Sequence, residues 1–524
     1  MHDTVERQRL VLALLGIAVL AAILRIPGIR WGFDLEPGVY HAFHPDEDHS
    51  CTNAMVYGLA WLDDPKNWTE RGVQIPCYWL SRLSGGDMEE GRAVLWARGV
   101  AVLAGLLGVG AAFLLGRRLW QSDQAGLWSA FFLATSGLHL VSSFFARGDA
   151  QGTLFQMLAV FCAVVAVTKP RAARWLFWAG AATGAAIAGR FYVSLLPLLG
   201  FAAFSSKPRT LWLVALRFGA AVIGTLLGFA AITGLRWSPT QVWNYLTVQR
   251  RVLQQSVGVE PIWIYLAALL ALLMAVGLPT LLFALGKLAA WGQKVWVGDS
   301  RGRRERLGDA IFSPTAVFLL PFAVQFLLIG NLKLFDARYV NGLVPACVIL
   351  AGGAAAACAT RRAGRALLVV ALVWQVVYAT GILLRYVDDP RARMLADLPN
   401  VLESSDRVAL SRYIPQTRAL ARFATPRRED ATVHIVSELH AQRFVRRPAG
   451  FSFLDQPRSC GEIRSCKSPE EFSYFRWLIS DPSFTKVAEY RATRLTPEMQ
   501  LYAALLGPNW VHSSDVKVLR RSGP

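Results

Sequence analysis

Long apolar stretches alternate with short polar ones over the first three quarters of the chain. Each approaches the roughly 20 residues that an α-helix needs to cross a bilayer. The stretches are residues 10–24, 93–115, 124–146, 150–168, 175–189, 191–204, 210–234, 262–286, 311–330, 339–359 and 366–384. The pattern predicts a mostly α-helical, polytopic membrane protein with about 11 transmembrane helices, because a helix satisfies its own backbone hydrogen bonds in lipid.

The composition supports a membrane protein. The 524 residues are 54% hydrophobic and 17% charged, whereas soluble proteins carry roughly 25% charged residues. The first apolar run lacks a small-residue cleavage site, so we expect a retained helix and no signal peptide. The net charge of +19 lies largely in short links between spans, where basic residues set orientation. We therefore expect membrane lipids as neighbours and no nucleic-acid partner.

The basic residues predict the orientation of the chain. With a cytoplasmic N-terminus, Lys and Arg make up about 31% of the short inner links and about 18% of the short outer ones. Merging the two short runs on either side of Arg190 would move the GRRER cluster at 302–306 outside, against this bias. Eleven crossings leave two large segments on the extracytoplasmic side, the loop 25–92 and the tail 385–524.

These segments define the expected domains. We predict a transmembrane domain at 1–384, which includes the outer loop 25–92, and an extracytoplasmic C-terminal domain at 385–524. Mixed patterns such as ATVHIVSEL at 431–439 and YFRWLI at 474–479 predict a small α/β or α+β fold for the tail.

The seven cysteines divide by location. Three lie in predicted spans, where a free thiol behaves as a small hydrophobe: Cys162, Cys347 and Cys358. The other four lie in outer segments, Cys51 with Cys77 and Cys460 with Cys466. Each outer pair fits either a disulfide of an oxidising compartment or two free buried thiols.

Ionisable residues gather in the outer loop, in HAFHPDEDHSC at 41–51. Pro45 disfavours helix at His44, so Asp46 is expected to open a helix with an acidic first turn. In one interpretation Asp46 and Glu47 only cap free amides and complement the helix dipole. In another, Asp46 and His44 hold a divalent metal, although their spacing matches no strong metal signature.

A second acid follows in FFARGDAQG at 144–152. A carboxylate at bilayer depth costs about 2.5–3.5 kcal/mol unless it is paired or hydrated, so one interpretation is a structural pair of Arg147 and Asp149. In a functional interpretation, carboxylates and outer cations share one pocket. An acceptor hydroxyl needs a carboxylate to take its proton, whereas a departing phosphate needs cations. This combination suits a sugar phosphate.

The same residues resemble a known family. The sequence is similar to the GT-C glycosyltransferases of the protein O-mannosyltransferase and aminoarabinose-transferase kind, which depend on polyprenyl phosphate. The similarity covers most of the chain up to about residue 410. The matching segments are FHPDE at 43–47, residues 92–120, FFARGDAQGTLFQMLAV at 144–160, residues 180–201, ARYVNGLVPACVILAG at 337–352 and residues 388–410.

The resemblance implies a GT-C-like membrane fold and an inverting transfer on the extracytoplasmic side, with a bacterial inner membrane as the expected location. The donor would be a polyprenyl-phosphate sugar and the acceptor a hydroxyl on a lipid, a protein or a polysaccharide. Asp46 would be the catalytic base or orient the acceptor, with Glu47 beside it in the acidic motif. Asp149 would lie beside the same pocket.

The resemblance also implies a donor-phosphate site. Arg338 and Tyr339 match the family's RY at the outer start of a late span, and Arg190 and Arg147 would add cations. The match departs at Gly148, where relatives commonly have proline, and at GRFY (189–192). No cofactor is required by the match, although a divalent metal remains an option.

The alternative function is a transporter or flippase of lipid-linked sugars. Transporters often have internal repeats and broken helices with ionisable groups near the middle of the membrane. The chain has no clear repeat, and most acids lie near the outer boundary. Arg98 and Arg217 fall inside predicted spans, and one option for Arg98 is a side chain that extends outward to the surface.

Overall fold

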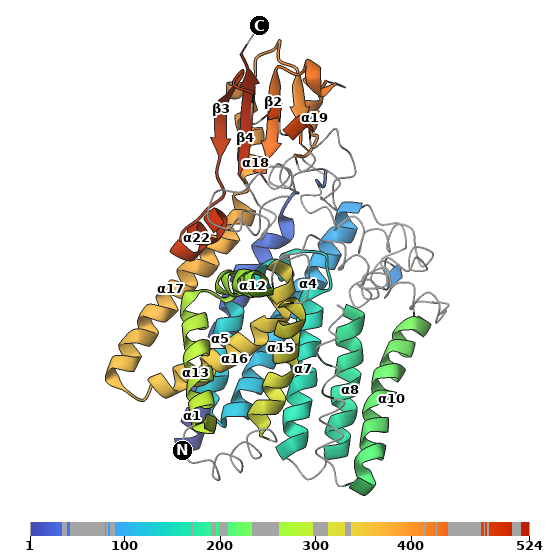
Figure 1. Ribbon diagram of the computed structural model, residues 1–524, viewed down its shortest axis with the longest axis vertical. Helices are drawn as coiled ribbons and strands as arrows, with labels where there is room; N and C mark the ends of the chain where they lie inside the picture. The colour runs from blue at the N-terminus through green and yellow to red at the C-terminus, as the bar shows by residue number, and fades with distance from the viewer. Residues whose placement is uncertain are drawn as a thin grey trace.

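The computed structural model shows a bundle of helices with a small β-sheet at one end (Figure 1). The N-terminus lies at the opposite end of the bundle, and the C-terminus lies beyond the sheet. The structure describes residues 2–33, 39–41, 79, 82–83, 90–168, 172–189, 195, 198, 208–232, 261–296, 313–330, 337–411, 414–425, 427–438, 473–475, 477–478, 481–505 and 515–522.

The helical part begins with α1 (His2–Arg25) and the 3-10 helix η1 (Ile26–Arg30). It continues with α4 (Glu90–Trp120), α5 (Asp123–Ala134), α6 (Gly137–Phe144), α7 (Asp149–Thr168), α8 (Ala172–Gly189), α10 (Pro208–Ile232), α12 (Pro261–Val276), α13 (Leu278–Trp296), α15 (Pro314–Gly330), η6 (Ala337–Leu343), α16 (Val344–Cys358) and α17 (Arg362–Val387). Proline at the first position of α10, α12 and α15 suits a helix start, where the missing N–H costs no hydrogen bond.

The prediction of a mostly helical membrane protein is confirmed, but the number of spans is not. Among the described residues, five helices are long and apolar enough to cross a membrane, or seven if each of two bent pairs is one span. The predicted span 124–146 is the pair α5 and α6, bent by 56°, and the predicted span 262–286 is α12 and α13, bent by 120°. The predicted span 191–204 lies outside the described residues except for 195 and 198.

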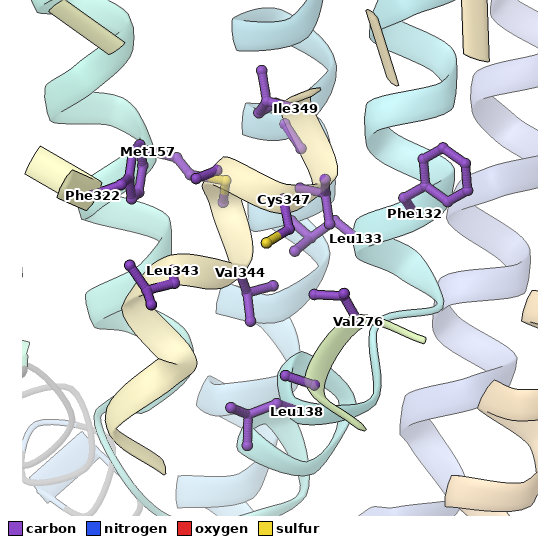
Figure 2. Packing of buried hydrophobic residues seen from close by; sticks show 14 of the residues in the cluster. Phe132, Leu133, Leu138, Met157, Val276, Phe322, Leu343, Val344, Cys347 and Ile349 are labelled. Carbon is purple, nitrogen blue, oxygen red and sulfur yellow. The ribbon is translucent and has the colours of Figure 1, made fainter. Parts of the chain in front are cut away.

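The two bends lie against each other in the core. The α12–α13 bend falls at Gly277, whose φ of +82° is accessible to glycine at little cost. Figure 2 shows Leu133 and Leu138, from either side of the α5–α6 bend, gathered with Val276 around the start of α16. Apolar side chains thus cover both breaks, and the carbonyl groups exposed by the breaks require partners inside the protein.

Side chains of α17 and of Ser136, the residue that caps the start of α6, supply those partners. Gln375 Nε2 donates to the carbonyl oxygens of Val276, at 2.6 Å, and of Thr135, at 3.4 Å. Ser136 Oγ donates to Ala275 O at 2.7 Å, and the Tyr378 hydroxyl donates to Met274 O. A single glutamine therefore serves both helix breaks and joins them to α17.

A buried arginine supplies further hydrogen-bond donors at the α5–α6 break. Arg25 is fully buried, and its guanidinium donates to Ala134 O at 2.9 Å and Leu133 O at 3.3 Å. It also lies 2.8 Å from His139 Nδ1. Because Arg25 ends α1, these bonds connect the first helix to the last carbonyl groups of α5.

Arg98 does not take the option of extending to the surface. Arg98 is fully buried, and its Nη1 donates to Ile29 O at 2.8 Å and Trp31 O at 2.6 Å. Carbonyl groups within η1 and just after it accept hydrogen bonds from the guanidinium inside the protein. Arg98 therefore attaches the start of the first outer loop to α4.

The C-terminal part contains a four-stranded sheet in the order β1-β2-β4-β3. Its elements are α18 (Pro390–Val401), β1 (Val408–Leu410), α19 (Arg418–Ala421), the 3-10 helix η7 (Arg428–Asp430), β2 (Val433–Ser437), β3 (Phe484–Tyr490), α22 (Pro497–Leu505) and β4 (Val516–Arg521). β1 is parallel to β2, while β4 is antiparallel to both β2 and β3.

Alternate residues of β2 face opposite sides of the sheet, as strand geometry requires. Val433 and Ile435 pack in a cluster with α18, whereas Val436 packs with Phe475 and Leu478. Burial lowers the pKa of His434 to about 4, so this side chain is neutral at neutral pH, and its Nδ1 lies 2.7 Å from the Tyr474 hydroxyl.

The predicted thiols Cys162, Cys347 and Cys358 are free cysteines, as expected. The predicted pairs Cys51 with Cys77 and Cys460 with Cys466 lie outside the described residues.

We predict that Gln375→Leu destabilises the protein. The substitution leaves Val276 O and Thr135 O without their side-chain donor, and each unpaired buried acceptor costs about 1–3 kcal/mol. Thermal unfolding of the detergent-solubilised protein should shift to lower temperature, whereas Gln293→Leu, at an exposed position of α13, should have little effect. Equal unfolding temperatures for the two variants would contradict the role of Gln375.

Candidate functional site

The structure describes part of the predicted site. Asp46, Glu47, His44 and Arg190 lie outside the described residues. The backbone of Arg338 is part of η6, but its side chain is not among those that the structure describes. The described members are Arg147, Asp149 and Tyr339.

Arg147 and Asp149 form the turn between α6 and α7. Both are 7% exposed, and Arg147 Nε lies 3.8 Å from Asp149 Oδ2. Asp149 is the first residue of α7, where a carboxylate complements the positive end of the helix dipole. The ion pair expected from the sequence is therefore present, and burial makes its two charges depend on each other.

The close packing around Gly148, between these two residues, accounts for the glycine in the RGD sequence of the turn. A Cβ at Gly148 would overlap the carbonyl oxygen of Gly189, the last residue of α8. Proline, which the family commonly has here, carries a Cβ and does not fit this packing. The close backbone contact places the Arg147–Asp149 turn against the end of α8, immediately before Arg190 in the sequence.

Amide side chains hold η6 against the same region. Asn341 Nδ2 lies 3.3 Å from Ser142 Oγ on α6, and Gln156 Nε2 of α7 donates to Gly342 O at 3.1 Å. Gln325 Nε2 of α15 donates to Tyr339 O at 3.2 Å. These contacts bring the predicted RY segment beside the helices that flank the Arg147–Asp149 turn.

The start of the first outer loop packs on the other side of this turn. The rings of Trp31 and Phe145 are 5.5 Å apart, and a Cβ at Gly28 would lie against the Phe144 ring. The His41 amide donates to Gly32 O at 3.0 Å, so the chain returns to the same place three residues before His44. The segments that lead into the acidic motif thus contact the segment that carries Asp149.

A buried ion pair joins this region to the C-terminal part. Arg391 donates to both carboxylate oxygens of Asp389, at 2.8 and 2.7 Å, and Trp31 Nε1 donates to Asp389 Oδ2 at 2.9 Å. All three residues are nearly inaccessible to solvent. The first outer loop, the end of α17 and the start of α18 therefore meet at Asp389.

Helix α22 makes a second connection. Glu498 is 3% exposed, and its Oε1 accepts a hydrogen bond from Trp374 Nε1 on α17 at 2.9 Å. The same oxygen lies 3.5 Å from the Leu278 amide at the start of α13. Figure 1 shows α22 beside the end of α17 that lies nearest the sheet.

Gln151 is a buried residue that the sequence analysis did not select. It is 4% exposed, and neither its Nε2 nor its Oε1 has a hydrogen-bond partner in the described part of the chain. It lies two residues after Asp149 in the first turn of α7. An unpaired buried amide is costly, and polar residues within apolar runs are the sequence signal that would have identified it.

Among the described residues, one set of three acids is close enough together to hold a metal ion. It is far in sequence from His44 and Asp46, the predicted metal ligands. Glu438, Glu489 and Asp515 of the C-terminal part lie close together. Each is paired with a cation, Lys517 at 2.6 Å, Lys486 at 2.7 Å and Arg494 at 2.6 Å respectively. These ion pairs neutralise the group, so we assign no metal to it.

Part of the chain matches known glycosyltransferases. Residues 90–237 match the family described as dolichyl-phosphate-mannose-protein mannosyltransferase. The chain is also 31% identical over 192 residues to the undecaprenyl phosphate-alpha-4-amino-4-deoxy-L-arabinose arabinosyl transferase of Pseudomonas aeruginosa (strain LESB58). That alignment covers 35% of this chain and 34% of the relative, so the match spans about one third of the relative's length.

Two solved structures are distantly similar. ArnT from Cupriavidus metallidurans bound to undecaprenyl phosphate aligns with a TM-score of 0.48 and 14% identity, covering 99% of this chain and 99% of that chain. The oligosaccharyltransferase AglB from Archaeoglobus fulgidus, in complex with an inhibitory peptide and a dolichol-phosphate, aligns with a TM-score of 0.46 and 13% identity over 75% of this chain and 56% of that chain.

The matched segment 90–237 contains Arg147, Asp149 and Arg190, and the predicted resemblance to the GT-C glycosyltransferases is confirmed over this part of the chain.

Proposed function

We propose that the protein is a membrane glycosyltransferase that moves a sugar from a polyprenyl-phosphate donor to an acceptor hydroxyl on the extracytoplasmic side, with inversion. The observation that carries the proposal is the meeting of three segments around the Arg147–Asp149 turn: the start of the outer loop, the end of α8 and η6. Each of these segments leads directly into a residue of the predicted site.

The length of the connecting chain limits the distance between the acidic motif and the start of the outer loop. Asp46 follows five residues after His41, whose amide is bonded to Gly32, and five Cα-to-Cα steps span at most about 18 Å. We assign Asp46 as the base or the group that orients the acceptor, with Glu47 as its neighbour. Asp149 is the second acid of the site, held in place by Arg147.

In the proposed reaction, Asp46 takes the proton of the acceptor hydroxyl. The acceptor oxygen attacks the anomeric carbon from the face opposite the phosphate, and the bond between that carbon and the phosphate oxygen breaks. Polyprenyl phosphate leaves with the electron pair, and Arg338, Tyr339, Arg190 and Arg147 stabilise its charge. No step requires a metal, and the residues of the metal option lie outside the described part of the chain.

The proposal keeps the domain division at residues 1–384 and 385–524, with the N-terminus cytoplasmic and the tail extracytoplasmic. The sheet supplies a separate hydrophobic cluster, while Asp389 and Glu498 attach it to the helical part. Such an attachment would let the tail contribute to the choice of acceptor.

One observation supports the alternative function as a transporter. Broken helices are common in transporters, and the structure has two bent pairs. In this protein, however, the carbonyl groups at the bends are bonded to Gln375, Ser136 and Tyr378 rather than being left for a substrate. We therefore favour the enzyme, and release of free polyprenyl phosphate by purified protein with donor and acceptor would separate the two functions.

Asp46→Asn should abolish sugar transfer while membrane insertion and abundance stay unchanged, because the amide cannot accept the acceptor's proton at neutral pH. Product formation and polyprenyl-phosphate release from a panel of lipid-linked sugars would measure this. Asp48→Asn, at an acid with no assigned role, is the control and should keep most activity. Full transfer by the Asp46 variant would remove the proposed base.

Arg338→Ala should weaken the donor more than the acceptor, raising the donor KM by about tenfold or more, as expected for loss of a charge-assisted phosphate contact. Steady-state kinetics with each substrate varied in turn would test this. Arg361→Ala, at the exposed turn between α16 and α17, is the matched control. Unchanged donor KM in the Arg338 variant would contradict the assignment.

Gln151→Leu should leave the unfolding temperature unchanged or raise it, because it removes a buried amide that has no partner in the described residues. Activity should nevertheless fall, since we infer that this amide binds a substrate hydroxyl. Gln156→Leu on the same helix should instead lower stability by about 1–3 kcal/mol, because Gly342 O loses its donor. A destabilised but fully active Gln151 variant would reject the inference.

A further inference from the structure

A basic pocket lies at the end of α8 that is remote from the candidate site. It has a volume of about 530 Å³ and is lined by Ala173, Arg174 and Phe177 of α8 and by Arg217 of α10. Fifteen residues of α8 separate Arg174 from Gly189, which contacts the Arg147–Asp149 turn, and this corresponds to about 22 Å along the helix. The pocket is therefore distinct from the proposed donor-phosphate site.

The packing of two parallel helices forms this pocket. A Cβ at Gly180 would overlap Phe218 O, and a Cβ at Gly184 would lie 2.8 Å from Val222 O. Because the contacts advance in the same direction along both helices, α8 and α10 run parallel and in close contact from Gly180 onward. The pocket opens just before this contact, and Figure 1 shows α8 and α10 as the outermost pair on one side of the bundle.

No described acid balances the charge of the pocket. Its described lining contains two arginines and no acid. Within the ranges that the structure describes, neither Arg174 nor Arg217 takes part in a hydrogen bond or an ion pair. Arg217 lies nine residues into α10, about 14 Å along the helix, and both arginines are exposed on the surface of the protein, so a ligand outside the protein has access to them. Two exposed guanidinium groups without a partner among the described residues, set beside apolar side chains, thus favour an anion as the ligand of the pocket.

The surface around the pocket is apolar. Phe177 and Trp178 of α8 are 43% and 50% exposed, and Leu216 and Ile223 of α10 are 48% and 59% exposed. In the predicted topology both helices belong to membrane spans, 175–189 and 210–234, where large exposed apolar side chains contact lipid chains. A ligand that presents a phosphate to the arginines and hydrocarbon to these side chains would satisfy both parts of the surface.

We propose that this pocket binds the headgroup of an anionic phospholipid. The phosphate lies between the guanidinium groups of Arg174 and Arg217, which are suited to charge-assisted, bidentate contacts with phosphate oxygens. The acyl chains lie along the apolar faces of α8 and α10. Basic pockets between transmembrane helices are known to recognise lipid headgroups in this way. The inference does not depend on the proposed transferase activity.

Native mass spectrometry of the purified full-length protein, titrated with phosphatidylglycerol or phosphatidylcholine, tests the proposal. The wild type should bind phosphatidylglycerol in preference to phosphatidylcholine. Arg174→Gln combined with Arg217→Gln should weaken phosphatidylglycerol binding by about tenfold or more, as expected for loss of charge-assisted hydrogen bonds. Equal binding by this double variant and the wild type would overturn the proposal, as would equal binding of the two lipids by the wild type.

Two controls make the result specific. Arg362→Gln combined with Arg365→Gln removes the same charge from the exposed start of α17 and should leave lipid binding unchanged. An equal loss of phosphatidylglycerol binding in this variant would show that net charge alone attracts the lipid, and would overturn the proposed binding pocket. Arg338→Ala should also keep phosphatidylglycerol binding, whatever its effect on the donor. A double variant that changes self-association but not lipid binding would identify a second copy of the chain as the occupant instead.

Discussion

The structure depends on hydrogen bonding at two interrupted helices inside the apolar core. A helix break in lipid leaves carbonyl groups that water cannot reach, and each must find a donor within the protein. Gln375 donates to carbonyl groups of both breaks, and Arg25 serves the end of α5 from the first helix. These long side chains fix α1 and α17 relative to the bent pairs, so helices distant in sequence acquire defined positions.

The candidate site follows from that arrangement. The bend between α5 and α6 directs the chain to the Arg147–Asp149 turn, and the packing of Gly148 on Gly189 brings the end of α8 to the same point. Amides from α7 and α15 then hold η6 nearby. The charged residues are positioned by uncharged ones, since the contacts that bring these segments together are glycine packing, aromatic rings and amide hydrogen bonds.

The C-terminal part is attached through buried acids. Asp389 binds Trp31 and Arg391 at once, and Glu498 binds Trp374. Removing a partner from a buried carboxylate leaves its charge uncompensated, so loss of Trp31, Arg391 or Trp374 would affect both parts of the protein. The sheet is therefore coupled to the end of α17 and to the loop that precedes the acidic motif.

Apolar runs and residue types by themselves determined the mostly helical membrane character. The order of six matching segments, from FHPDE at 43–47 to residues 388–410, determined the resemblance to glycosyltransferases, because both can be found along the sequence without its three-dimensional contacts. Hydropathy could not show that 124–146 and 262–286 are bent, since a broken and a straight span have the same composition. Nor could it show that Arg98 is buried or that Gln151 lacks a partner within the described chain. Those features depend on which carbonyl groups and backbones approach from remote segments, and only the tertiary structure decides them.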